Sequence, residues 1–537
     1  MTTCRIATRP PVGPVVLPVV SHDPDAVASF LEDAAHYHGG HAAGVAFART
    51  EGEVAAVLRA CDRVLPIGAQ SSLTGGATPM GEVILNTTRL ADIIHIGDDC
   101  VRLHPGVVLS TLQESLARAG RYYPPAPTYN GACVGGTLST NASGAATFKY
   151  GSTREWVRAL TVVLASGEVL EIERGQVRAA GDGFFEVQPL AGEVQRVPVP
   201  SYRMPNVPKR SAGYFAEPGM DLVDLFVGSE GTLGVIVEAR LNIVAHAPTR
   251  CLALVPCPTE KGAIALVDWL RRESHATWRE RDPRGLDVSA IEQMDRRCLE
   301  MLREDGEDRK HDVQFPDGTA VALLVQIELP SDITADAAFD QLAAARDADA
   351  ADTPLLRFCR LLDRAGVLDD VEMALPGDTR RAEQFFAVRE AVPSAVKHRV
   401  GVAKQEVDPS IEKTAADMVV PFEQFADVMA VYHDGFGRRG LDYAIWGHIS
   451  DGNVHPNVIP RTVRDMTLGR EAVLEFGREV IARGGCPLAE HGVGRSPLKQ
   501  ALLRQLYGDE GVEQMRAVKR ALDPQWKLSP GVLFPLK

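Results

Sequence analysis

The segment PIGAQSSLTGGATP occupies residues 66–79 and follows a short apolar stretch that ends at Leu65. Glycine lets the backbone approach a ligand closely and adopt positive φ, so that successive N–H groups form a nest for an anion, and hydroxyl groups add further donors. The segment carries both kinds of residue, namely Gly68, Gly75, Gly76, Ser71, Ser72 and Thr74. Its spacing differs from the G-x-G-x-x-G fingerprint of nicotinamide dinucleotide binding. It therefore predicts a phosphate-binding loop of a different kind.

Two more loops of this composition follow along the chain. GGTLSTNASGAATFKYGSTRE covers residues 135–155 and combines glycines with hydroxyl, amide and cationic side chains. GSEGTLGVI covers residues 228–236 and runs into a segment, 235–244, whose apolar residues alternate as in a strand. A single glycine loop is most often an ordinary turn. Three such loops in the first half of one chain favour a shared ligand.

The first half of the chain has the pattern of strands and short helices. Residues 46–62 predict a helix, residues 83–86 a strand, and LTVVLASGEVLEI (160–172) a hairpin that turns at Ser166-Gly167. Longer amphipathic helices are predicted after about residue 246. The 537 residues exceed what one hydrophobic core supports, so we expect two or three domains, of the α+β class.

Composition limits the partners and the compartment. The formal net charge of −14 argues against nucleic acid or an anionic membrane as the main partner, and an anionic substrate would need a locally basic pocket. The nine cysteines include no C-x-x-C pair and no cluster suited to an iron–sulfur centre, which predicts reduced thiols and a separate electron acceptor if the protein is redox-active. Without an apolar run long enough to span a bilayer, a cytoplasmic protein is predicted, with peripheral membrane attachment as an alternative.

A histidine pair surrounds a turn signal later in the chain. GHISDGNVH begins at Gly447, and Asp451-Gly452 is a strong two-residue hairpin signal. If that dipeptide is the turn, His448 and His455 pair directly, with Cβ atoms about 5 Å apart, so that both imidazoles can bind one divalent metal. Two surface histidines near a turn are an equally weighted alternative.

The segment AEHGVGR supplies a second cluster, in which Glu490 and His491 are adjacent. Adjacent side chains diverge in regular structure, so one can bind a metal while the other acts as a base. Two histidines and one carboxylate leave open metal positions for a substrate oxygen or water.

In order and spacing, the three glycine loops resemble the FAD-binding domain of the vanillyl-alcohol oxidase and p-cresol methylhydroxylase (PCMH) superfamily. The resemblance implies a two-lobed PCMH-type domain with FAD contacts at Gly68, Gln70, Ser71, Ser72, Gly75, Gly76, Gly135, Gly136, Thr137, Asn141, Gly144, Glu230, Gly234 and Ile236. Some members attach the flavin covalently through a histidine in the first loop. This chain has Gln70 and no histidine there, which implies noncovalent FAD.

GHISDGNVH, AEHGVGR and the terminal DPQWKLSPGVLF (523–534) resemble the FAD-linked D-2-hydroxyacid dehydrogenases, a group that includes D-lactate dehydrogenase, D-2-hydroxyglutarate dehydrogenase and the glycolate oxidase flavoprotein subunit. The resemblance implies that His448, His455 and Glu490 hold a divalent metal, with zinc favoured over manganese or iron. It implies that His491 is the base and that Asn453 contacts substrate or flavin.

Two cationic residues complete the implied substrate site. Arg389 lies in FFAVREAVP, which matches the family's segment with a carboxylate-binding arginine; a helix-surface arginine is the alternative. Lys413 begins KTAADMVVP, the match to a family lysine, and Lys404 competes for that assignment.

The resemblance also predicts the domain plan. We expect a PCMH-type FAD-binding domain over residues 1–245 with a long insertion at about 174–220. A substrate or cap domain with an antiparallel sheet and the metal site follows over residues 246–485, and residues 486–537 return to the FAD domain.

The function implied is oxidation of a small 2-hydroxy carboxylate, such as D-lactate, glycolate or D-2-hydroxyglutarate, to the 2-oxo acid, with metal assistance and hydride transfer to flavin N5. The alternatives are phenol, sugar or ether-lipid chemistry on the same fold, or a flavin electron-transfer subunit. The separate acceptor could be a cytochrome, a quinone or an electron-transferring flavoprotein, and a homodimer is one option. The sequence does not distinguish the acid, its stereochemistry, the metal, the acceptor or the oligomeric state.

Overall fold

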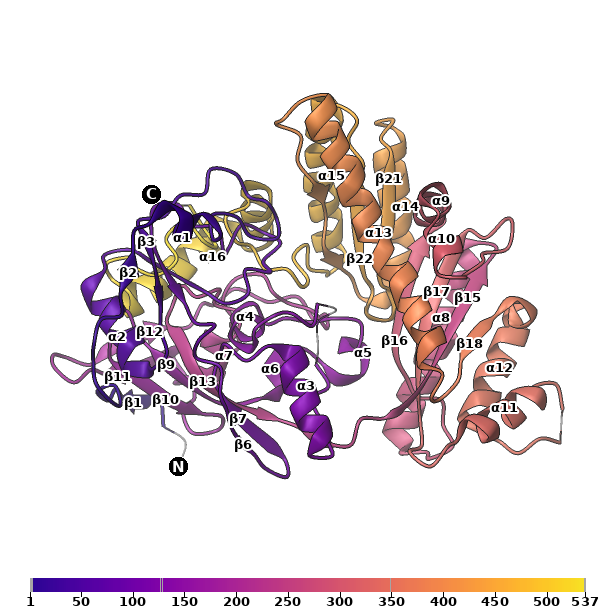
Figure 1. Ribbon diagram of the computed structural model, residues 1–537, viewed down its shortest axis with the longest axis horizontal. Coiled ribbons are helices and arrows are strands. Elements are labelled where there is room, and N and C mark those ends of the chain that lie inside the picture. Colours follow the sequence, from indigo (N-terminus) through magenta and orange to yellow (C-terminus); the bar gives the residue numbers. More distant parts are fainter. Residues whose placement is uncertain (1–2, 126, 128, 348, 536–537) are drawn as a thin grey trace. The chain divides into compact units, whose positions relative to one another are not determined.

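A computed structural model describes residues 3–125, 127, 129–347 and 349–535 (Figure 1). The chain divides into two compact units. Unit 1 comprises residues 1–144, 151–247 and 486–537, and unit 2 comprises residues 145–150 and 248–485. Each combines helices with sheets, and unit 2 contains a large antiparallel sheet, so the predicted α+β class is confirmed.

Unit 1 contains a small, mainly parallel sheet and a larger antiparallel one. The order of the first is β2-β3-β5-β4, with β2 (Val20–Ser21), β3 (Gly44–Phe47), β4 (Val64–Ile67) and β5 (Val83–Asn86). The order of the second is β10-β9-β13-β7-β6, with β6 (Ile93–Ile96), β7 (Cys100–Leu103), β9 (Val157–Val163), β10 (Val169–Glu173) and β13 (Val235–Asn242). The pairing of β9 with β10 confirms the hairpin predicted around Ser166-Gly167.

The remaining elements of unit 1 are short strands and helices. The strands are β1 (Arg5–Ala7), β8 (Arg121–Tyr122), β11 (Phe184–Gln188), β12 (Gln195–Pro198) and β14 (Val244–Ala245). The helices are α1 (Pro24–Ala28), α2 (Glu51–Ala60), α3 (Leu109–Arg118), α4 (Val134–Thr140), α6 (Thr153–Trp156), α7 (Leu222–Phe226) and α16 (Pro497–Leu522). Strands β11 and β12 form a small sheet with β1, so the segment expected as an insertion contains regular structure.

The core of unit 1 lies around α2. Val54, Val57 and Leu58 pack with residues of β5, β9 and β13, which joins the two sheets. The helix predicted over residues 46–62 is shorter, because Thr50 caps α2 by accepting from the Glu53 N–H, and the residues before it pair with β5 as strand β3.

Unit 2 is built on one antiparallel sheet of order β18-β15-β17-β16-β21-β22-β19, with β20 also paired to β22. Its strands are β15 (Thr249–Cys257), β16 (Val288–Asp295), β17 (Val321–Leu329), β18 (Glu372–Ala374), β19 (Thr414–Ala415), β20 (Met418–Val419), β21 (Tyr443–His448) and β22 (Asn453–Val458). Its helices are α5 (Thr147–Tyr150), α8 (Glu260–Glu280), α9 (Arg296–Asp305), α10 (Glu307–Lys310), α11 (Ala335–Ala343), α12 (Pro354–Ala365), α13 (Thr379–Glu406), α14 (Phe425–Gly437) and α15 (Val463–Ala482), with 3-10 turns η1 (Leu368–Asp370), η2 (Phe422–Gln424) and η3 (Ile449–Asp451).

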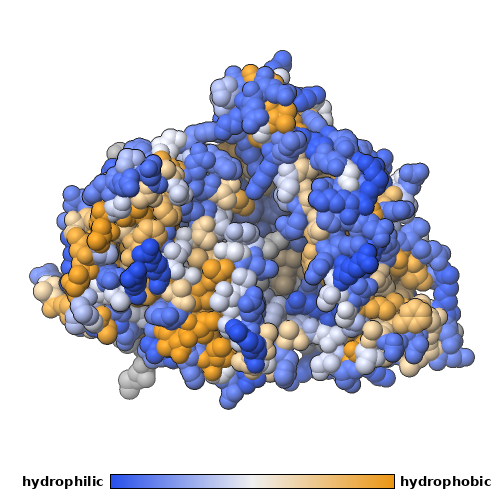
Figure 2. All heavy atoms as spheres, in the orientation of Figure 1, coloured by the Kyte–Doolittle hydropathy of each residue, from blue (hydrophilic) through white to orange (hydrophobic). Residues whose placement is uncertain are grey.

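The long helix α13 packs on one face of this sheet (Figure 1). Phe385, Val388, Val392 and Val396 form a common core with residues of β15, β16 and β17. Hydrophilic residues cover much of the face shown in Figure 2, as the composition predicts. In the described part of the chain, no helix combines the length and apolar character needed to cross a membrane.

The C-terminal segment completes unit 1. Leu528 pairs with Val64 beside β4 and belongs to the core around α2. Lys519 on α16 is buried, and its ammonium donates to the Thr232 carbonyl at 2.6 Å, to Asp523 at 2.6 Å and to the Leu528 carbonyl at 2.8 Å. Burial lowers the pKa of Lys519 to about 8, although Asp523 opposes this shift. One side chain thus ties α16, the third glycine loop and the end of the chain together.

Lys519→Met is expected to lower the free energy of unfolding by about 3–5 kcal/mol, because the substitution leaves the buried Asp523 carboxylate without its cationic partner and removes a donor from two carbonyls. Denaturation by urea, followed by tryptophan fluorescence, measures the change. Arg520→Met is the matched control, because Arg520 is partly exposed and pairs with Glu513 on the surface, so a change of about 0–1 kcal/mol is expected. Equal effects of the two substitutions would contradict the role of Lys519.

Candidate functional site

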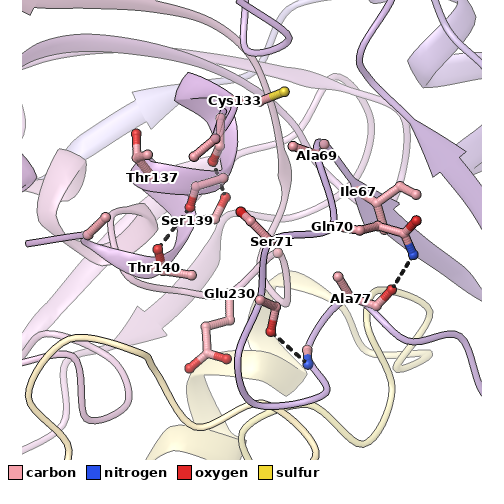
Figure 3. A pocket seen from close by; sticks show the side chains of 18 of the residues that line it. Ile67, Ala69, Gln70, Ser71, Ala77, Cys133, Thr137, Ser139, Thr140 and Glu230 are labelled. Carbon is pink, nitrogen blue, oxygen red and sulfur yellow. Dashed lines mark hydrogen bonds between the residues drawn. The ribbon is translucent and has the colours of Figure 1, made fainter. Parts of the chain in front are cut away.

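The three glycine loops line one cavity of about 300 Å³ in unit 1 (Figure 3). Of the predicted FAD contacts, the lining includes Gly68, Gln70, Ser71, Ser72, Gly76, Gly135, Gly136, Thr137, Glu230, Gly234 and Ile236. It does not include Gly75, Asn141 or Gly144. Glu490 and His491, from the segment AEHGVGR, also lie in the wall.

The first loop is shaped by its own side chains. The Gln70 amide donates to the carbonyls of Phe30 at 2.9 Å and Ala77 at 3.0 Å, so this side chain holds the loop (Figure 3). The Ser72 hydroxyl accepts from the Gly76 N–H at 3.2 Å. Gly75 has φ +77°, and a Cβ there would lie 2.7 Å from the Tyr37 ring, so only glycine fits.

The second loop forms α4 and the turn after it. Gly136, in the first turn of α4, faces open space, since a Cβ at this position would meet no atom within 4 Å. Asn141 ends the helix at φ 48°, and its amide oxygen accepts from the Arg154 N–H at 2.9 Å and the Ser152 hydroxyl at 3.1 Å. Asn141 therefore supports the loop from behind the cavity wall.

These features fit the FAD that the resemblance implies. A cavity of this volume lies at the lower end of the range for ligand sites. Its wall combines glycine backbone with hydroxyl groups. The glycine N–H groups and the Ser71 hydroxyl are suitable donors for a pyrophosphate, whereas the hydroxyls of Thr137, Ser139 and Thr140 already donate to carbonyls within α4.

The third loop brings a partly buried carboxylate into the same wall. Glu230 has φ 52°, and its carboxylate accepts from the N–H groups of Val493 and Gly494, each at 2.8 Å. Burial raises the pKa of Glu230 to about 7, although these two hydrogen bonds oppose the shift. Glu230 thus fastens the backbone directly after His491 to the third glycine loop.

Glu490 has a partner in unit 1 that sequence reasoning missed. The Lys209 ammonium, which is completely buried, donates to the Glu490 carboxylate at 2.6 Å. The two residues are 281 positions apart, and no local pattern marks Lys209. His491 is less buried than Glu490, with a side chain about 30% exposed, and the Glu490 and His491 side chains approach to 4.0 Å.

In unit 2 the structure corrects the predicted register of the histidine hairpin. His448 pairs with Asn453, and His455 pairs with Trp446. The turn is longer than two residues because a 3-10 turn at Ile449–Asp451 precedes Gly452, which has φ 75°. The two histidines are therefore diagonal neighbours on one face rather than direct partners, and their ring centroids lie 5.6 Å apart.

A buried glutamate contacts two of the predicted site residues. Glu292 Oε2, on β16, accepts from Arg389 Nε at 3.0 Å and Nη2 at 2.8 Å, and it lies 3.2 Å from His448 Nδ1. Burial alone would raise the pKa of Glu292, but the Arg389 guanidinium and the adjacent His448 imidazole hold it well below its usual range. Glu292 was not predicted, because its strand also contains Ser289, Gln293 and Asp295, so no sequence pattern distinguishes this acid.

His455 and Asn453 meet around Asp417. His455 Nδ1 lies 3.4 Å from Asp417 Oδ1, and the Asn453 amide donates to the same oxygen at 3.2 Å and to the Met418 carbonyl at 2.9 Å. All three side chains are buried. Lys413, by contrast, is exposed, and its ammonium lies 6.0 Å from the centroid of the Trp446 ring.

The histidine pair fits a metal. Each Nδ1 lies beside a buried carboxylate, Glu292 for His448 and Asp417 for His455. Metal-binding histidines commonly donate the other ring N–H to a carboxylate, which leaves Nε2 as the ligand atom and makes it more basic.

Comparisons with known proteins cover both parts of the chain. Residues 42–173 match the family profile of the FAD binding domain, and residues 274–533 match that of the C-terminal domain of FAD linked oxidases. D-2-hydroxyglutarate dehydrogenase of Xanthomonas citri pv. viticola is 28% identical over 90% of this chain and 87% of its own. Glycolate oxidase subunit GlcD of Bacillus subtilis is 26% identical, with coverage of 90% and 87%. D-lactate dehydrogenase of Anaerostipes hadrus is 27% identical, with coverage of 89% and 86%.

The fold also resembles solved structures. Alkyldihydroxyacetonephosphate synthase superposes with a TM-score of 0.57 at 14% identity, covering 95% of this chain and 83% of that one. At this identity the likeness concerns the fold alone, and it confirms the predicted PCMH-type architecture.

The raised pKa of Glu230 predicts a pH-dependent contribution to stability. The folded protein binds this proton more tightly than the unfolded chain, whose glutamate pKa is about 4.5, so the contribution is complete below pH 4.5 and is lost as the pH rises through about 7. Between pH 5 and pH 8, the wild type should lose up to about 3 kcal/mol relative to Glu230→Gln. Urea denaturation of the apoprotein at several pH values measures this difference. Glu238→Gln removes a partly exposed carboxylate that pairs with Arg102 and serves as the control; the same pH dependence in both variants would contradict the assignment.

Proposed function

We propose that this chain, which matches the family profiles of the FAD binding domain and of the C-terminal domain of FAD linked oxidases, oxidises a small 2-hydroxy carboxylate to the 2-oxo acid with the help of a divalent metal. It is an FAD-dependent oxidoreductase that acts on hydroxy acids. D-lactate, glycolate and D-2-hydroxyglutarate are the proposed substrate class, because relatives at similar identity carry the names of enzymes for all three.

One observation carries the proposal: the segment with Glu490 and His491 lies in the wall of the cavity that the three glycine loops form. This supports a base and a metal ligand beside the flavin site. The FAD contacts that we propose are the predicted residues in the lining, while Gly75, Asn141 and Gly144 would act by shaping the loops. Bound FAD supplies the two-electron acceptor for the oxidation.

The proposed metal ligands are His448, His455 and Glu490. The metal, zinc by preference, supplies a Lewis acid that lowers the pKa of the substrate hydroxyl. Support comes from the two buried rings 5.6 Å apart and the carboxylate beside each Nδ1. Lys209 holds the Glu490 carboxylate in one orientation within its own unit.

His491 and Arg389 have separate tasks in this proposal. His491 removes the hydroxyl proton, as a neutral imidazole can near pH 7. The planar fork of Arg389 binds the substrate carboxylate. The buried position of Arg389 argues against its being a helix-surface arginine.

Asn453 and Lys413 have supporting parts. From the family resemblance, we propose that Asn453 contacts substrate or flavin. Because Lys413 is exposed, we propose that it contributes positive charge rather than a direct contact. Electrons would pass to a separate acceptor, because the nine cysteines form no cluster in the sequence that could hold an iron–sulfur centre.

The proposed function is tested by a spectral titration. Purified protein with bound FAD is expected to bleach anaerobically with one acid from a panel of D- and L-lactate, glycolate and D- and L-2-hydroxyglutarate, and to lose most of this rate after treatment with a chelator. Restoration by Zn²⁺ or Mn²⁺ identifies the metal. If FAD and metal are both present and no acid bleaches the flavin, hydroxy-acid oxidation by this chain is refuted.

The two proposed roles also predict a separation of kinetic constants. His491→Gln is expected to lower kcat about 10²–10⁴-fold, the usual contribution of a general base. Arg389→Lys keeps the charge that Glu292 requires but loses the bidentate fork, so it should mainly raise KM for the acid. Steady-state rates with an artificial acceptor measure both. A kcat of the His491 variant within a factor of two of wild type would exclude its role as base.

A further inference from the structure

Glu292 lies at the meeting point of two proposed functional groups in unit 2. A single oxygen, Oε2, accepts from two nitrogens of Arg389, at 2.8 Å and 3.0 Å, and lies 3.2 Å from Nδ1 of His448. Arg389 comes from α13, Glu292 from β16 and His448 from the end of β21. Three elements that are distant in sequence therefore converge on one carboxylate.

The surroundings of Glu292 make this carboxylate unusual. Every residue of β16 is buried, and Met294, on the same face of the strand, packs in the core with Val388 and Val392. An ionised carboxylate is expensive at such a position unless cationic and hydrogen-bonding partners surround it. We therefore look for the role of Glu292 in the two side chains that it contacts, Arg389 and His448.

We propose that Glu292 is a positioning residue, which orients the guanidinium of Arg389 for the substrate carboxylate and the imidazole of His448 for the metal. This inference rests on the proposed function of Arg389 and His448. Glu292 itself touches neither substrate nor metal in this role.

The contact with Arg389 orients a flexible side chain before the acid binds. The Nε–Nη2 edge of the guanidinium bonds to one oxygen of Glu292, which restricts the rotation of the whole planar group. Nη1 of the same guanidinium donates to Glu390 at 3.0 Å, so the contact with Glu292 involves two of the five N–H donors and the contact with Glu390 a third. Ordering the fork in advance removes part of the entropy cost of binding.

The contact with His448 selects the ring nitrogen for the metal. A carboxylate beside Nδ1 favours the proton on that atom, which makes Nε2 the lone-pair donor. Loss of such an outer carboxylate typically weakens metal affinity about 10–100-fold. Glu292 thereby links acid binding to metal binding through one side chain.

The test compares Glu292→Gln with Glu260→Gln. Glu260 pairs with His433 at 2.9 Å in the same unit but lies outside the proposed site, so it is a matched glutamate–histidine pair. With FAD-loaded protein stripped of metal, calorimetric titration with Zn²⁺ and with Mn²⁺ should show a Kd about 10–100-fold higher for Glu292→Gln and an unchanged Kd for Glu260→Gln. At saturating metal, KM for the acid should rise at least several-fold in Glu292→Gln while kcat changes less. Wild-type metal Kd and wild-type KM in folded Glu292→Gln would overturn the proposal.

Glu292→Asp decides the case if the glutamine variant does not fold. It keeps the buried charge but withdraws the carboxylate by one methylene, so a positioning role predicts a folded protein with weakened metal binding and raised KM. A folded Glu292→Asp variant with both constants as in wild type would show that Glu292 serves stability alone. Failure of the proposed function looks different, because the wild type itself would then bind no metal or respond to no acid.

Discussion

A charge removed from water must be paired, and in unit 1 this constraint fastens the end of the chain to the glycine loops. The guanidinium of Arg495 donates to the Thr78 carbonyl at 3.0 Å and to Glu82 at 2.9 Å. Glu230 binds the backbone of residues 493 and 494, and Lys519 binds the Thr232 carbonyl. These contacts span hundreds of residues, and each involves a buried or partly buried charged group. The cavity wall and the position of His491 beside it both depend on them.

Unit 2 applies the same rule within an apolar sheet. Arg389 and Glu292 neutralise each other between β16 and α13, while Asp417 receives contacts from His455 and Asn453. Removing one member of such a buried pair usually destabilises a protein by about 3–5 kcal/mol, so these side chains have little freedom to change singly. Stability and the proposed chemistry therefore place demands on the same residues. This overlap is why the kinetic tests need conservative substitutions such as Arg389→Lys.

The parts predicted correctly from sequence depend on local patterns. Glycine and hydroxyl residues mark the three loops that line the cavity, and alternation with Ser166-Gly167 marks the β9–β10 hairpin, because turn chemistry and strand period operate over a few residues. The predicted register of the histidine hairpin was wrong because the turn is longer than the dipeptide Asp451-Gly452. It also includes the 3-10 turn that begins at Ile449. The roles of Lys209 and Glu292 could not be predicted from sequence, because each depends on a contact with a residue far along the chain. Lys209 contacts Glu490, 281 residues away, and Glu292 contacts Arg389, 97 residues away. The helix at 46–62 was too long because Thr50 caps α2, so the residues before it were left to extend β3.

The charges of Arg389, Glu292 and Asp417, which lie with His448 and His455 in unit 2, indicate that a metal would affect binding of the acid as well as catalysis. The positive charge of Arg389 is matched by Glu292, and Asp417 adds a further buried carboxylate next to His455. With neutral histidines, this cluster has no excess positive charge to attract an acid, in a chain whose net charge is already −14. A divalent cation would add two positive charges to this group of side chains. Removal of the metal should therefore weaken the binding of the acid itself, whereas a metal that served only to lower the pKa of the hydroxyl would leave binding nearly unchanged.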